Sequence, residues 1–112
     1  MNRERKAPQA IACRNGELTP EEHTRRDELR ESLKQATGQV VETAEGYCFR
    51  FLEAGAFLEA AEWVTLERRC CPFLDFELEW PSDAAPSLHL TGGQGVKEFL
   101  ASGLAPFEKR PR

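Results

Sequence analysis

The sequence predicts an α+β fold: a four-stranded antiparallel sheet, made of two hairpins, with two main helices and a short C-terminal helix packed on one face. The first observation behind this prediction is the order of periodic segments, which runs helix, two strands, helix, two strands, helix. The second is that turn-forming residues separate the strand-like runs within each pair. The third is the length of 112 residues with 40% hydrophobic residues, which suits one core.

The first helix is predicted over residues 20–36. Thr19 is a favourable N-cap, a proline occupies the first helical position, and Glu22 stands three residues after the cap, as in a capping box. Gly38 is expected to end the helix. The few apolar residues of this helix predict a narrow buried stripe and a large solvent-facing surface.

A hairpin follows, with strands expected over residues 39–43 and 47–52 and a tight reversal at 44–46. Side chains alternate between the two faces of a strand. Cys48 and Arg50 therefore share one face of the second strand, opposite a row of aromatic residues: Tyr47, Phe49 and Phe51.

The second helix is predicted from residue 56 to 70 or 71, because Pro72 disfavours helical geometry in the residue before it. Two further strands are expected over residues 73–80 and 87–91. A short last helix is expected to run through Val96, Phe99 and Leu100, and the two tryptophans, Trp63 and Trp80, are predicted to anchor the core.

The end of the second helix carries the residues best suited to bind a metal ion or to react. At about 100° per residue, Cys71 falls on the apolar face, Cys70 at its edge, and Glu67 between them. Residues three and four apart on a helix are neighbours, so Glu67 can approach both thiols. An inward carboxylate must be hydrogen-bonded, paired with a cation or used in chemistry, because burial otherwise costs several kcal/mol.

Three functions fit this group. In the first, Cys70 and Cys71 bind a soft ion such as zinc, copper(I), mercury(II) or arsenic(III), with Glu67 as a supporting carboxylate and Cys13 and Cys48 as candidate further ligands. In the second, one cysteine is a redox or nucleophilic thiol and the other resolves its oxidised form. In the third, the cysteines are structural and the protein is an interaction module. The sequence leaves open whether the protein is an enzyme.

The composition limits which classes of partner and which cell compartment we expect for this protein. A formal net charge of −4 gives no general attraction to nucleic acid or to anionic membranes. No apolar run reaches the roughly 20 residues of a membrane span, and no signal core follows the polar start. We therefore expect a cytoplasmic protein with reduced cysteines, whose partner is a metal ion or a small thiol-reactive molecule. The sequence is compatible with a homo-oligomer.

One domain is expected over residues 13–104, between a flexible leader at 1–12 and a basic tail at 105–112. Within that domain, Glu67-Arg68-Arg69-Cys70-Cys71-Pro72-Phe73 is followed by Phe76 and by Leu90-Thr91-Gly92. These residues resemble a family of small bacterial proteins with a Glu-Arg-x-Cys-Cys-Pro-Phe motif, over about Cys13 to Leu100. Some members are associated with heavy-metal resistance, so the resemblance implies a soft-metal or thiol role.

Overall fold

The computed structural model describes residues 11–12 and 14–103. Most of the predicted leader, Cys13 and the predicted tail at 105–112 lie outside the described residues.

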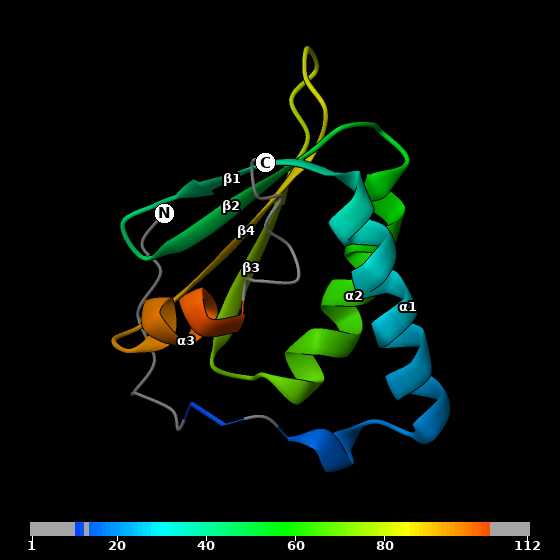
Figure 1. Ribbon diagram of the computed structural model, residues 1–112, viewed down its shortest axis with the longest axis vertical. Coiled ribbons are helices and arrows are strands. Elements are labelled where there is room, and N and C mark those ends of the chain that lie inside the picture. Colours follow the sequence, from blue (N-terminus) through cyan, green and yellow to red (C-terminus); the bar gives the residue numbers. More distant parts are fainter. Residues whose placement is uncertain (1–10, 13, 104–112) are drawn as a thin grey trace, which may run out of the picture.

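The sheet has four strands in the order β1-β2-β4-β3, and every neighbouring pair is antiparallel. The first hairpin is made by β1 (Thr37–Glu42) and β2 (Gly46–Phe51), and the second by β3 (Leu74–Glu79) and β4 (Ser87–Gly92). The two hairpins join through the central pair β2–β4, as Figure 1 shows. The predicted antiparallel sheet of two hairpins is confirmed.

Three helices lie on one face of this sheet: α1 (Pro20–Ala36), α2 (Ala56–Cys70) and α3 (Val96–Gly103). A short 3-10 turn, η1 (Asn15–Glu17), precedes α1. In Figure 1, α1 and α2 run side by side, and α3 lies apart from them, where it contacts β2 and β4. Because α2 contacts both α1 and β3, it is covered on two sides. The predicted α+β architecture is therefore the one observed.

The start of α1 follows the sequence signal, whereas its end does not. Thr19 Oγ1 accepts a hydrogen bond from the backbone N–H of Glu22 at 3.1 Å, and the N–H of Thr19 donates to Glu22 Oε1 at 2.9 Å. The helix then ends at Ala36 and β1 begins at once, so Gly38 is not the terminator that we expected. The buried Thr37 makes a glycine cap unnecessary, because its hydroxyl donates to the Leu33 carbonyl at 2.7 Å.

The core lies between the helices and the inner face of the sheet. It contains aromatic and aliphatic residues from α1, α2, α3 and the sheet. Among them are Leu29, Leu33, Phe49, Phe51, Ala60, Trp63, Leu88, Leu90, Val96 and Leu100. Trp63 is buried, as predicted, and meets Phe76 edge to face at 6.2 Å between ring centroids. Trp80 is instead half exposed and packs against Phe57, because it lies beyond the end of β3.

Candidate thiol site

The end of α2 holds two buried thiols. Cys70 is the last residue of the helix and Cys71 is its C-cap, with 1% and 2% of their surfaces exposed, and neither forms a disulfide. The backbone of the pair is fixed by three hydrogen bonds. The N–H of Cys71 donates to the Glu67 carbonyl at 2.7 Å, that of Arg14 donates to the Cys70 carbonyl at 2.7 Å, and that of Leu74 donates to the Cys71 carbonyl at 3.2 Å.

The two sulfur atoms have different polar neighbours. Arg26 Nη1 donates to Cys70 Sγ at 3.2 Å, whereas Cys71 Sγ lies 3.7 Å from Glu67 Oε2, at hydrogen-bonding distance for a sulfur donor. Arg26 Nε also lies 3.8 Å from Glu67 Oε1, an ion pair without a hydrogen bond. We call these four side chains the thiol cluster: Arg26, Glu67, Cys70 and Cys71.

Arg26 is the member of the thiol cluster that the sequence reasoning missed. It belongs to α1, and its side chain is 19% exposed. A signal was present, because Arg26 stands three and seven residues before Leu29 and Leu33, the two buried residues of that helix. Residues at these spacings share one helix face. An arginine in line with a narrow buried stripe is therefore placed to meet a polar group on the facing helix.

The buried stripe of α2 is turned relative to the prediction. Cys70, expected at the edge of the apolar face, lies in the middle of the buried residues, whereas Ala61 and Val64 are only half-buried. The reason is that α2 packs between α1 and the sheet, so burial extends over two sides of the helix. The buried positions of α2 are Ala56, Ala60, Trp63, Leu66 and Cys70.

Glu67 lies toward α1 with 18% of its side chain exposed. Burial raises the pKa of this carboxyl above its ordinary value of 4.5, and the nearby positive charge of Arg26 opposes that rise. Its Oε1 atom is buried and has no hydrogen-bond partner among the described residues. The thiol cluster therefore contains a carboxylate oxygen that has an ion pair with Arg26 at 3.8 Å but accepts no hydrogen bond from any described residue.

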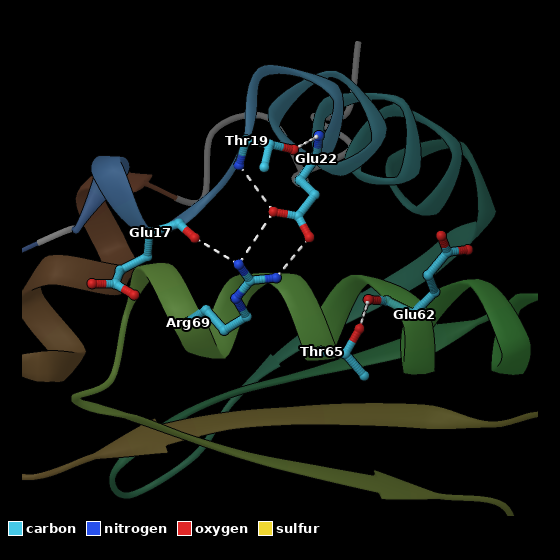
Figure 2. Close-up of polar contacts among 6 residues, drawn as sticks. All are labelled: Glu17, Thr19, Glu22, Glu62, Thr65 and Arg69. Carbon is cyan, nitrogen blue, oxygen red and sulfur yellow. Dashed lines mark hydrogen bonds and ion pairs between the residues drawn. The ribbon is translucent and has the colours of Figure 1, made fainter.

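Arg69, next to Cys70 in sequence, makes different contacts, which Figure 2 shows. Its guanidinium donates to Glu22 Oε2 at 2.8 Å and to the Glu17 carbonyl at 2.6 Å. The hydrogen bond from Arg69 is the main reason that the pKa of Glu22 falls to about 2. Arg69 thus ties the last turn of α2 to the start of α1, which helps to hold the two cysteines in place.

The structure does not bring Cys48 to the thiol cluster. Phe49 and Phe51 belong to the same core as Cys70 and Cys71, and strand alternation places Cys48 on the opposite face of the sheet. Its neighbours across the strands are Val41 and His89. The other candidate ligand, Cys13, lies outside the described residues.

Within residues 11–12 and 14–103, no three His, Cys, Asp or Glu side chains converge in a way that could hold a metal ion. In the same part of the chain, no helix has the length and apolar character needed to cross a membrane.

Comparison of the chain with protein-family models, with curated proteins and with solved structures gave no match. The fold and the site therefore define the protein in structural terms: an α+β domain in which two adjacent buried thiols meet a glutamate of their own helix and an arginine of the neighbouring helix.

Proposed function

We propose that the protein binds a soft metal or metalloid ion through Cys70 and Cys71, with Glu67 as the supporting carboxylate. The observation that carries the proposal is the Oε1 atom of Glu67, which is buried without a hydrogen-bond partner among the described residues and lies one helical turn from the two thiols. A buried acceptor without a donor is costly. A bound cation would satisfy it.

The chemistry of the donor set favours a thiophilic ion. Thiolates select copper(I), zinc, mercury(II) and similar soft or borderline ions over magnesium and calcium, which prefer oxygen ligands. Binding would release the thiol protons, so affinity should fall as the pH is lowered. The donors do not converge on one point as they stand, so Cys71 and Glu67 would turn toward the ion as it binds. Arg26 would then release Cys70 and offset part of the negative charge of the ligands.

A second candidate function is thiol chemistry without a metal, and the Arg26–Cys70 contact favours it. A hydrogen bond from a guanidinium is strongest when its acceptor is an anion, as a reacting cysteine is. Cys70 would react first, and Cys71 would resolve the oxidised sulfur with Glu67 as its base. Against this candidate, adjacent Cα atoms lie about 3.8 Å apart, closer than the usual disulfide range.

Native mass spectrometry of the reduced protein, titrated separately with zinc, copper(I) and mercury(II), tests the first proposal. The wild type should bind one ion, and the Cys70→Ser/Cys71→Ser variant should not. Cys48→Ser is the matched control, since it removes a buried thiol from the other face of the sheet and should bind as the wild type does. If no ion binds to the reduced wild type, or if the double variant binds equally well, metal binding by the pair is wrong.

Two further variants protect this test against misfolding and separate the two candidates. Glu67→Gln keeps both thiols and should weaken ion binding without abolishing it. Arg26→Gln removes the guanidinium from Cys70, so it should slow alkylation of Cys70 under the second candidate and should leave or strengthen ion binding under the first. Alkylation of each cysteine is followed by peptide mapping, and circular dichroism confirms that each variant is folded.

A further inference from the structure

A second group of chemically active side chains lies on the face of the sheet opposite the thiol cluster. Cys48 on β2 and His89 on β4 are partners in the strand register, and Cys48 Sγ lies 3.7 Å from His89 Nε2. The same ring nitrogen lies 3.3 Å from Glu79 Oε1 at the end of β3. Three neighbouring strands thus bring together a thiol, an imidazole and a carboxylate.

The two contacts of His89 Nε2 have a chemical consequence. A ring nitrogen without a proton can accept the Cys48 proton, and a protonated one can donate to Glu79. Loss of the thiol proton to Nε2 therefore creates the donor that the carboxylate requires, and the negative charge of Glu79 stabilises the imidazolium that forms. Because both contacts use Nε2, they alternate: the ring nitrogen accepts from the thiol before proton transfer and donates to Glu79 after it.

The imidazole and the carboxylate of this group are open to solvent, whereas the thiol beside them is nearly buried. Cys48 is 5% exposed, whereas the side chains of His89 and Glu79 are 28% and 61% exposed. Alternation along β3 places three carboxylates on the Cys48 face: Asp75, Glu77 and Glu79. Arg50 is the cationic residue of β2 on the same face. The surroundings of Cys48 are therefore acidic and favour a positively charged reagent.

We propose that Cys48 is a modification site that forms a mixed disulfide with a small, positively charged disulfide, with His89 as general base. Cys48 Sγ attacks one sulfur of the reagent, so a new S–S bond forms while the original S–S bond breaks and its electron pair leaves on the departing sulfur. The Cys48 proton passes to His89 Nε2 and then to the departing thiolate. The reagent disulfide is the oxidant, and the products are the protein mixed disulfide and one small thiol.

The test uses the full-length reduced protein and two aliphatic probes, cystamine, which is cationic, and dithiodiglycolate, which is anionic. Peptide mapping by mass spectrometry follows Cys48 and the Cys70–Cys71 peptide separately in the same sample. Cys48 of the folded protein should react with cystamine about tenfold faster than with dithiodiglycolate at low ionic strength, and salt should reduce the difference.

Variants test the role of the histidine. His89→Gln should slow modification of Cys48 by roughly a hundredfold, the lower end of what a positioned general base contributes. Glu79→Gln, at an exposed position, should slow it less and reduce the preference for cystamine. His23→Gln, on α1, is the matched control and should react as the wild type does. The proposal is overturned if Cys48 reacts only after denaturation, or if His89→Gln reacts as fast as the wild type.

Discussion

Glu67 is the residue whose protonation should most alter the stability of the thiol cluster. Burial raises its pKa above 4.5, so the folded protein favours the neutral carboxyl. The stability that this group contributes is complete below its unfolded pKa and is lost as the pH rises through its folded pKa. The Glu67→Gln variant has no titrating carboxyl at this position, so it does not lose this stability as the pH rises. The free energy of unfolding of this variant, relative to wild type, should therefore increase from acid to neutral pH in urea titrations.

Glu62 on the same helix is the matched control for that measurement. A hydrogen bond from Arg25 lowers the pKa of Glu62, the opposite direction from Glu67. Its stabilising contribution is present above the unfolded pKa and is lost as the pH falls. Glu62→Gln should therefore become less stable relative to wild type as the pH rises. If both variants change in the same direction with pH, the assigned environment of Glu67 is incorrect.

The residue scale also shows what a single sequence can and cannot locate. Helical periodicity was sufficient to place Glu67 inward and beside a thiol, because that depends on neighbours within four residues. The contact of Arg26 with Cys70 joins positions 44 residues apart on two helices. It depends on how α1 packs against α2, which periodicity does not determine.

At the scale of the element, the capping box at the start of α1 gives a direct prediction. Thr19→Ala removes the hydroxyl that accepts the N–H of Glu22, and it should lower the free energy of unfolding by about 1 kcal/mol. Thr24→Ala is the control, because Thr24 is an exposed residue inside the same helix. Its hydroxyl donates a hydrogen bond to the Pro20 carbonyl of that helix. Its change should stay within about 0.5 kcal/mol. Equal losses in urea unfolding would contradict the assigned cap.

The contact between Arg69 and Glu22 links two elements and should be visible in an acid titration. The pKa of Glu22 is about 2 instead of 4.5, so its contribution to stability is present above 4.5 and is lost as the pH falls toward 2. Arg69→Gln should return the pKa of Glu22 toward 4.5, measured from the carboxyl carbon by NMR. Arg68→Gln, at the exposed position beside it, should leave the Glu22 titration unchanged. A Glu22 pKa near 2 in Arg69→Gln would show that another donor is responsible.

The limits of the elements were predictable where a local signal sets them. The N-cap at Thr19 sets the start of α1, and Pro72, which follows the two cysteines, sets the end of α2. Both act through local backbone geometry. The end of α1 was predicted from Gly38, but the backbone is already extended at Thr37, whose buried hydroxyl donates to the Leu33 carbonyl. That contact depends on burial at the junction of helix and sheet, which the sequence does not display.

At the scale of the whole molecule, the sheet separates Cys48 from the thiol cluster. Alternation in β2 predicted that Cys48 would face away from the aromatic row, and the core confirms where that row lies. The pairing of Cys48 with His89 could not be predicted, because it follows from the register of β2 on β4, which are not consecutive strands. Sequence patterns give the faces of each strand, whereas the choice of neighbours is made by the packing of the whole sheet.

The β2–β4 pair is also where one substitution should affect the entire fold. Gly46 pairs with Thr91, and a Cβ atom at Gly46 would overlap the carbonyl of Leu90 on the facing strand. Because this pair joins the two hairpins, the strands would have to separate at one end of the central strand pair. Gly46→Ala should therefore lower the free energy of unfolding by about 3 kcal/mol, the upper end for overpacking, and increase amide exchange in both β2 and β4.

Gly93→Ala is the control for that experiment, since no heavy atom lies within 4 Å of a Cβ placed there. Its free energy of unfolding should stay within about 0.5 kcal/mol of wild type. Protection lost only in β2 would mean that the first hairpin opens by itself and that β4 does not depend on it. Loss in both strands together would establish the central pair as the contact that makes the two hairpins one cooperative unit. Cys48 and the thiol cluster would then belong to the same unit.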